Sequence, residues 1–116
     1  AREYERAIAT IDKIAPLSED GEYYMRKDGI YNELGEWQRV ADSAKQALDA
    51  GLKKPAKAHM LAGMAYSELD QYTDSIKAFR RARQLSEPGE RKAVDAWIAF
   101  VEEKISLANA KVASAN

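Results

Sequence analysis

The chain has 116 residues, which is enough for one domain with a single modest core. Its 18 lysine and arginine residues nearly cancel its 19 aspartate and glutamate residues, so the formal net charge is −1 and nucleic-acid binding is disfavoured. With no cysteine and a single histidine, His59, the chain lacks the side chains for disulfides, thiolate zinc sites or a Ser-His-Asp triad. We therefore expect no enzymatic activity, no metal and no cofactor.

Two further features of the sequence bear on its class. No apolar run approaches the roughly 18 residues that a membrane helix needs, so we expect that the chain does not span a membrane. The chain begins at Ala1 rather than at a methionine, and we interpret it as processed or as part of a longer protein.

Six helices are predicted, because segments rich in strong helix formers alternate with prolines and glycines. In chain order they cover residues 2–14, 22–34, 37–50, 56–69, 72–85 and 90–108. In the last segment, Val94, Trp97, Phe100, Val101 and Ile105 form one amphipathic stripe. No stretch alternates apolar and polar residues as a strand would, so the predicted fold class is all-α. Residues 110–116 are small and polar and are expected to form a flexible tail.

An internal repeat is visible when the chain is shifted against itself by 35 residues. The shift places Met25 on Met60 and Trp37 on Tyr72, at the same points of two helix pairs. The opening helix has Tyr4 placed 33 residues before Trp37, so it resembles the second helix of a further copy. Self-similarity of this kind indicates a helical repeat array.

The spacing and identities resemble the tetratricopeptide repeat family, whose unit is a helix–turn–helix of about 34 residues. Within residues 55–88 the family's signature positions are matched by Gly63, Tyr66, Tyr72, Phe79, Ala82 and Leu85. Residues 21–54 match less well, because Lys27 and Asp28 stand where an apolar and a small residue are expected, and this predicts loose packing or a polar surface there.

This resemblance implies an α-α superhelix of helix–turn–helix repeats within a single domain of residues 1–109. In that domain, residues 1–17 would be the second helix of a partial repeat, 21–54 and 55–88 two repeats, and 90–108 a capping helix. The capping helix is expected to cover the last apolar face of the array.

The C-terminal half carries a narrower resemblance. The stretches 51–55 and 76–82, and the pattern of Trp97 and Phe100 before two glutamates, look like tetratricopeptide proteins encoded beside bacterial TonB-type energising systems. Because those proteins are exported, the resemblance implies a periplasmic location, with the cytoplasm as the alternative. It also implies a component of such a system as partner.

Two polar features outside the predicted groove, the single histidine and a basic cluster, are expected to be structural rather than functional. His59 corresponds to Tyr24 in the other copy, so we expect a ring packed between helices rather than a catalytic group. Lys77, Arg80 and Arg81 form a basic cluster at i, i+3 and i+4 on the outer side of a second helix. A solvated face is the expected role of this cluster, and an acidic partner or an anionic membrane surface is the alternative.

The resemblance also predicts a binding groove, because the first helices of such repeats line a concave surface that commonly binds a peptide. The corresponding positions here are Glu22, Met25, Gly29, Asn32, Glu33, Lys57, Met60, Met64, Ser67 and Glu68. All three methionines of the chain belong to this set, and methionine suits surfaces that adapt to a partner. Partial burial in the core is the alternative for Met25 and Met60. The rim is mainly acidic, so a neutral or basic segment is the expected ligand.

The leading hypothesis is a non-catalytic scaffold that binds a partner protein or peptide in its concave groove, as part of a cell-envelope transport system. The alternative is an oligomerisation or assembly element of a larger repeat protein. It rests on Ile8, Ile11 and Ile14, because the opening helix lacks a preceding helix and its apolar face is expected to be open to another copy.

Overall fold

The computed structural model describes residues 2–17 and 21–115. Within these residues six α-helices follow one another and no strand occurs, which confirms the predicted all-α class. The helices are α1 (Arg2–Ile14), α2 (Glu22–Leu34), α3 (Trp37–Ala50), α4 (Ala56–Glu68), α5 (Tyr72–Leu85) and α6 (Arg91–Ala115). Short 3₁₀ turns, Ala15–Leu17 and Pro88–Glu90, follow α1 and precede α6. The first five predicted helices are confirmed to within one residue at each end.

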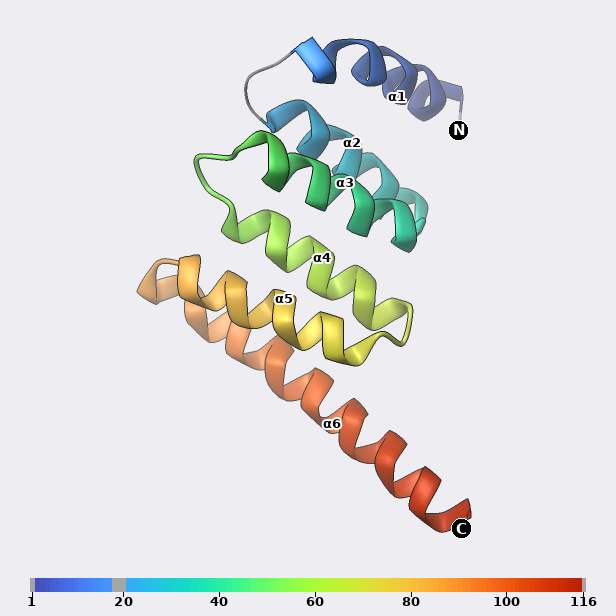
Figure 1. Ribbon diagram of the computed structural model, residues 1–116, viewed down its shortest axis with the longest axis vertical. Coiled ribbons are helices and arrows are strands. Elements are labelled where there is room, and N and C mark those ends of the chain that lie inside the picture. Colours follow the sequence, from blue (N-terminus) through green and yellow to red (C-terminus); the bar gives the residue numbers. More distant parts are fainter. Residues whose placement is uncertain (1, 18–20, 116) are drawn as a thin grey trace.

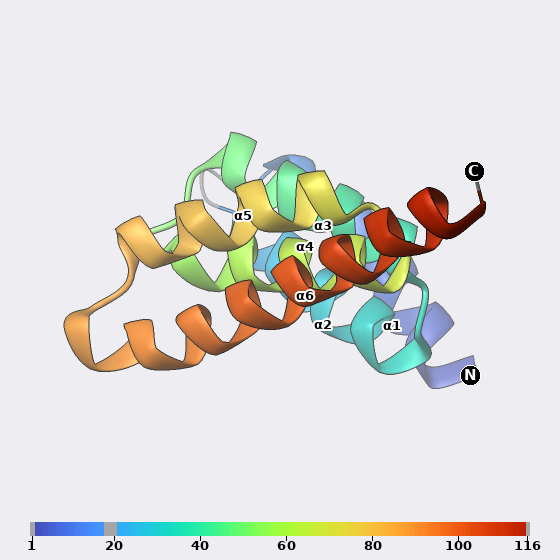
Figure 2. The ribbon, with the colours of Figure 1, turned by 90° about the horizontal axis from the view of Figure 1, so that it is seen from below.

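The helices are stacked in chain order in one elongated row (Figure 1). The most extensive contacts join α4 to α5, α2 to α3 and α3 to α4. The molecule measures 51 × 34 × 19 Å along its principal axes, and its thin dimension is visible in the second view (Figure 2). Each helix therefore buries its apolar face mainly against the helices before and after it.

The turns inside the two helix pairs have the same backbone conformation. After α2, Gly35 is left-handed (φ 69°), and the amide that follows it donates to the Tyr31 carbonyl oxygen at 3.0 Å. After α4, Asp70 is left-handed (φ 59°), and the amide that follows it donates to the Tyr66 carbonyl oxygen at 2.8 Å. Glycine adopts this conformation without strain and aspartate tolerates it. The two turns that the 35-residue shift aligns therefore share a left-handed residue and the same backbone hydrogen bond.

The interior of the second helix pair is built around Phe79, which is fully buried. A Cβ atom on Gly63 would lie 2.8 Å from the Phe79 ring, so glycine is what lets α4 approach α5 this closely. The Ser75 hydroxyl donates to the Gly63 carbonyl oxygen at 2.7 Å across the same contact. The equivalent positions of the first pair are Asp28 and Ala44, so there the larger side chain is on the first helix.

The apolar face of α1 is covered by α2, so it is not open as we predicted. Ile11 is buried, and Ile8 is partly buried against the cluster that contains Tyr31 and Val40. Ile14 alone of the three isoleucines is exposed, at 38%. The predicted open face is therefore wrong for Ile8 and Ile11, because a helix of the same chain supplies their packing partner.

The last helix continues beyond its predicted end at residue 108 and reaches Ala115. Residues 110–115, predicted as a flexible tail, belong to this helix, and residue 116 lies outside the described part of the chain. The physical reason is that alanine and lysine favour the helix and that no glycine or proline stops it after Gly89.

The first half of α6 packs on α5, as the capping-helix prediction requires. Val94 and Val101 are buried, and the Trp97 ring stacks on Phe79 with 5.5 Å between ring centroids. Trp97 itself is half-buried. Phe100 was predicted on the same covering face, but it is 44% exposed and meets only the edge of Trp97 among the described aromatic contacts.

The second half of α6 extends away from the other helices (Figure 1). Its apolar side chains Leu107 and Val112 are exposed, at 58% and 63%. No helix in the described part of the chain is long and apolar enough to cross a membrane.

Candidate functional site

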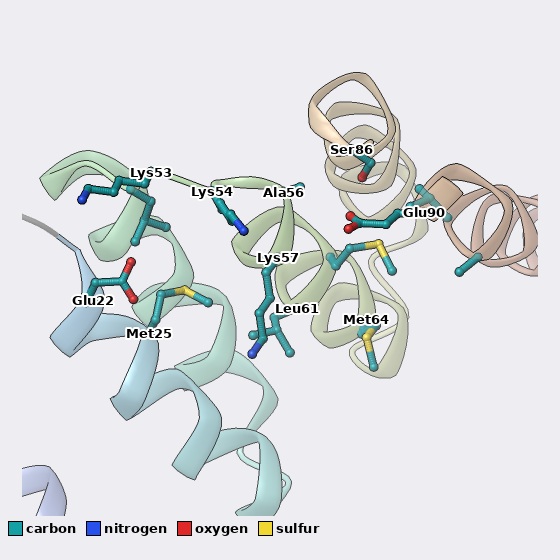
Figure 3. A pocket seen from close by; sticks show the side chains of 14 residues that line it. Glu22, Met25, Lys53, Lys54, Ala56, Lys57, Leu61, Met64, Ser86 and Glu90 are labelled. Atoms are coloured by element: carbon teal, nitrogen blue, oxygen red, sulfur yellow. The ribbon is translucent and has the colours of Figure 1, made fainter. Parts of the chain in front are cut away.

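An open groove of about 810 Å³ lies between α2, α4 and the beginning of α6 (Figure 3). The helix α4 forms its centre, and the turn between α3 and α4 contributes to its wall. Half of the ten residues that the sequence predicted for a groove line it, namely Glu22, Met25, Lys57, Met60 and Met64.

The three methionines are half-buried, and each combines core packing with exposure to the groove. Met25 packs against the alanine-rich cluster of α3, α4 and α5, and Met60 and Met64 pack against the cluster around Phe79. The two interpretations of these methionines are therefore compatible. One side of each side chain fills the core, and the other side forms part of the apolar floor.

The N-terminal turn of α2 is brought to the groove by a close approach at Gly21. A Cβ atom on Gly21 would lie 2.2 Å from the Ala47 carbonyl oxygen, so no larger residue fits there. The Gly21 amide donates to the Gly51 carbonyl oxygen at 2.6 Å, which joins the start of α2 to the α3–α4 turn. Glu22 and Met25 consequently lie beside that turn.

Several lining residues come from parts of the chain that the sequence did not indicate for the groove. Leu52, Lys53 and Lys54 belong to the α3–α4 turn, and Glu90 and Val94 lie at the start of the C-terminal helix region. The packing of α6 on α5 brings the last two residues to this face, and a contact between helices leaves no local signal in the sequence.

The charged rim of the groove differs from the predicted one. Glu22 and Lys57 project between α2 and α4, as predicted (Figure 3). The turn adds Lys53 and Lys54, and Glu90 adds one carboxylate, so lysines outnumber glutamates by three to two. The expectation of a mainly acidic rim is therefore wrong, and an acidic group is a better electrostatic match at the α3–α4 turn.

The other five predicted residues do not line the groove: Gly29, Asn32, Glu33, Ser67 and Glu68. They come from the C-terminal halves of α2 and α4, whereas the groove extends no further than Met25 on α2 and Met64 on α4. Glu33 accepts a hydrogen bond from the Tyr4 hydroxyl group of α1 instead. The sequence thus identified the helices of the groove but overestimated how far it extends along them.

Asp28 is a buried acid that the sequence did not single out as a site. It is fully buried, and among the described residues neither of its carboxylate oxygens has a hydrogen-bond partner. Burial raises its pKa from 3.8 to about 7, although the positive charge of Lys57 acts in the opposite direction. The neighbouring Lys27 is half-buried and pairs with Asp12 of α1 at 2.8 Å. The predicted polar surface at residues 27 and 28 is therefore wrong.

His59 lies half-buried on the other side of α4, where it lines a second hollow with Lys45, Lys77 and Arg81. Burial and, to a smaller extent, the positive charge of Arg81 lower its pKa. Of the predicted basic cluster, Lys77 and Arg81 face this hollow and Arg80 does not.

Across residues 2–17 and 21–115, no three His, Asp or Glu side chains gather so as to hold a metal ion. No protein-family model matches the chain, and no curated protein matches it. The groove is therefore interpreted from its own geometry and chemistry.

Proposed function

We propose that the chain is a non-catalytic protein-interaction scaffold that binds a segment of a partner protein in the methionine-lined groove. The observation that carries this proposal is an apolar groove of about 810 Å³ whose floor contains all three methionines of the chain. Large concave apolar sites with a few polar groups are the usual form of binding sites, and flexible thioether side chains adapt to a partner's shape.

We also propose that the helix pairs are tetratricopeptide-like repeats that form a short α-α superhelix with α6 as its cap. The repeated turn at Gly35 and Asp70 and the close contact of Gly63 with Phe79 support this proposal. In such an array the groove would lie on the concave side, lined by the first helix of each pair.

The proposed partner segment is apolar and carries an acidic group at one end. The apolar part matches the methionines, and the acidic group matches Lys53 and Lys54 of the α3–α4 turn together with Lys57 at the start of α4. Two repeats offer less surface than the roughly 1,200 Å² at which stable protein complexes begin, so the affinity is expected to be modest.

The cellular setting is proposed from the narrower resemblance of the C-terminal half. We propose a component of a TonB-type transport system of the bacterial envelope, in the periplasm, with a protein of that system as partner. The sequence of the whole parent protein tests the location. A parent protein with neither an export signal nor a membrane anchor would favour the cytoplasmic alternative.

Oligomerisation through α1 is not proposed as a second function. Its basis was an open face of three isoleucines, and α2 covers Ile8 and Ile11 within the same chain.

The groove is tested by peptide selection on the intact chain. We expect selected peptides to combine apolar residues with an acidic one. We further expect the double substitution Met60→Lys with Met64→Lys to weaken their affinity at least tenfold in fluorescence anisotropy. The matched control is Lys77→Glu with Arg80→Glu on the opposite side of the molecule, which should leave the affinity within twofold.

Circular dichroism of each variant shows whether the fold is kept. A peptide affinity that survives both methionine substitutions, or that is lost in the control variant, would contradict the groove proposal. Reversing the charge at Lys53 and Lys54 separates the two parts of the proposal, because it should weaken acidic peptides and leave neutral apolar ones unchanged.

A further inference from the structure

A second hollow, of about 320 Å³, lies between α3, α4 and α5. The helix α4 places His59 and Ala62 in this hollow, whereas it places Met60 and Met64 in the groove. With a rotation of roughly 100° per residue, the two pairs of side chains point to nearly opposite sides of α4. The hollow is thus a separate site, and its chemistry is independent of the function proposed for the groove.

The charges around this hollow are unbalanced. Lys45 of α3 and Lys77 and Arg81 of α5 line it, with Asp74 as the one carboxylate among its lining residues. Within the described residues none of the three cations has an ion-pair partner, and Arg81 donates a hydrogen bond to the neutral Gln84 at 3.0 Å. The lining side chains thus carry three positive charges and one negative charge, and Asp42 of α3 is near enough for its charge to act on Tyr66 at the edge of the hollow.

The junction between α1 and α2 shows how the same repeat fills this space elsewhere. There Lys27 lies 5.9 Å from the centre of the Tyr24 ring and reaches Asp12 with an ion pair of 2.8 Å. The 35-residue shift aligns Tyr24 with His59 and Lys27 with the short residue Ala62.

The acid of that ion pair is also replaced. The 33-residue shift that relates α1 to α3 aligns Asp12 with Lys45. In the first junction the chain's own ammonium and carboxylate groups therefore occupy the space and neutralise each other. In the second junction Ala62 contributes only a methyl group where the first junction has Lys27. Lys45 contributes a positive charge where the first junction has Asp12. Both side-chain volume and negative charge are therefore missing from the second junction.

We propose that this hollow binds a small dianion of the phosphate class, with Lys45, Lys77 and Arg81 as its charge partners and His59 as a hydrogen-bond donor. The excess of two positive charges among the lining residues matches a dianion. The planar guanidinium of Arg81 can donate two parallel hydrogen bonds to phosphate oxygens, and the lysines act as compact point charges. Free inorganic phosphate and a phosphate monoester share this chemistry.

The single histidine of the chain makes the site directly observable, because its imidazole proton signals are unambiguous in an NMR spectrum. Lys45 faces His59 from α3, Tyr66 lines the hollow from α4, and Asp74, Lys77 and Arg81 face it from α5. In the free protein burial and the charge of Arg81 disfavour the imidazolium form. A bound dianion favours that form, so we expect the pKa of His59 to rise when the site is filled.

The experiment is a titration of the intact chain with inorganic phosphate and with phenyl phosphate, at constant ionic strength against sodium chloride. We expect saturable shifts of the His59 signals. The single substitutions Lys77→Ala and Arg81→Ala should each weaken binding at least fivefold. Arg80→Ala is the matched control, since this arginine is exposed on the same helix outside the hollow, and it should change the affinity less than twofold.

A second variant tests the comparison of the two junctions. The double substitution Lys45→Asp with Ala62→Lys rebuilds the acid–lysine pair of the first junction inside the second. It should abolish saturable binding while the circular dichroism spectrum remains helical.

The two probes distinguish the possible ligands. Tighter binding of phenyl phosphate would identify an ester site, and equal binding of both probes would identify a site for the free ion. Shifts that do not saturate, that chloride reproduces, or that Arg80→Ala weakens as much as Arg81→Ala would overturn the proposal. Binding restricted to anionic vesicles or phosphopeptides, with neither small anion bound, would also overturn it.

Discussion

Asp28 and Gly63 occupy equivalent positions on α2 and α4, but Asp28 places a polar side chain in the interior and Gly63 places none there. Asp28 introduces a carboxyl group that has no hydrogen-bond donor, which costs free energy when the group is ionised. Gly63 removes a side chain altogether so that the Phe79 ring can fill the space. Each residue can be tested by a single substitution.

The substitution Asp28→Asn is expected to remove a pH dependence of stability. The pKa of this carboxyl group is about 7 in the folded chain against 3.8 ordinarily, so between these values the folded state binds more protons than the unfolded state. The free energy of unfolding therefore falls as pH rises through this window. At about 1.4 kcal/mol per pKa unit, the loss amounts to a few kcal/mol by pH 8.

Urea denaturation at pH 5 and pH 8 measures this effect. Asp28→Asn should flatten the difference and be more stable than the original chain at pH 8. Asp12→Asn is the control, because its exposed ion pair contributes less than about 1 kcal/mol. An unchanged pH dependence in Asp28→Asn would contradict the burial argument.

Two glycines inside helices are expected to respond in opposite directions to the same substitution. Gly63→Ala places a Cβ atom 2.8 Å from the buried Phe79 ring and should destabilise the chain by about 1–3 kcal/mol. Gly29→Ala meets no atom within 4 Å and should stabilise it by about 0.5–1 kcal/mol, because alanine is the better helix former. Thermal denaturation of the two variants side by side decides this, and a stabilising Gly63→Ala would show that α4 and α5 can separate at no cost.

At the scale of the elements, α6 joins a packed half and an exposed half in one continuous helix. Its first half supplies Val94, Trp97 and Val101 to the core, and its second half leaves Leu107 exposed. The helix should therefore divide into a part that is required for folding and a part that is not.

Removal of residues 107–116 is expected to cost less than about 1 kcal/mol of stability, because the apolar side chains lost are already in water. Trp97→Ala should cost more, about 2–3 kcal/mol, which is less than the 3–5 kcal/mol typical of a fully buried tryptophan because the ring is half-buried. Guanidinium denaturation measures both changes. A truncation as damaging as Trp97→Ala would mean that the distal half of α6 is covered in solution.

Some elements of the fold are predictable from the sequence and others are not, for physical reasons. The bounds of α1 to α5 follow from local punctuation by glycine and proline, which the sequence displays directly. The end of α6 was underestimated because small residues suggested fraying although they also favour helix. The walls of the groove were only half predicted, because Lys53, Lys54 and Val94 reach it through the packing of distant segments.

The burial of Asp28 was missed for a related reason. An acid in a helix suggests a surface position, since unpaired charges are rarely buried. Its burial results from the packing of several helices, which no single position of the sequence displays.

At the scale of the whole molecule, the row of helices predicts a gradient of local stability. The most extensive contacts join the helices from α2 to α5, whereas α1 packs mainly on α2 and the end of α6 extends alone. Opening of such a stack begins at its ends. Amide hydrogen exchange followed by mass spectrometry should thus be slowest in α4 and fastest in α1 and residues 107–115. Equal protection of α1 and α4 would show instead that the chain unfolds as one unit.

In the two helix pairs the larger side chain stands on different helices, on the first helix in one pair and on the second in the other. This difference limits which single substitutions can convert one pair into the other without loss of stability. In one pair Gly63 lies against Phe79, and the equivalent positions of the other pair hold Asp28 and Ala44. Converting the first pattern to the second by Asp28→Gly alone leaves a cavity, and by Ala44→Phe alone creates a clash. Alanine at both positions avoids the clash but leaves the space of the buried Phe79 ring empty, so this intermediate also carries a defect. The two pairs thus differ by substitutions that compensate each other. A chimera in which a single helix is exchanged between the pairs should therefore be less stable than one in which a whole helix pair is exchanged.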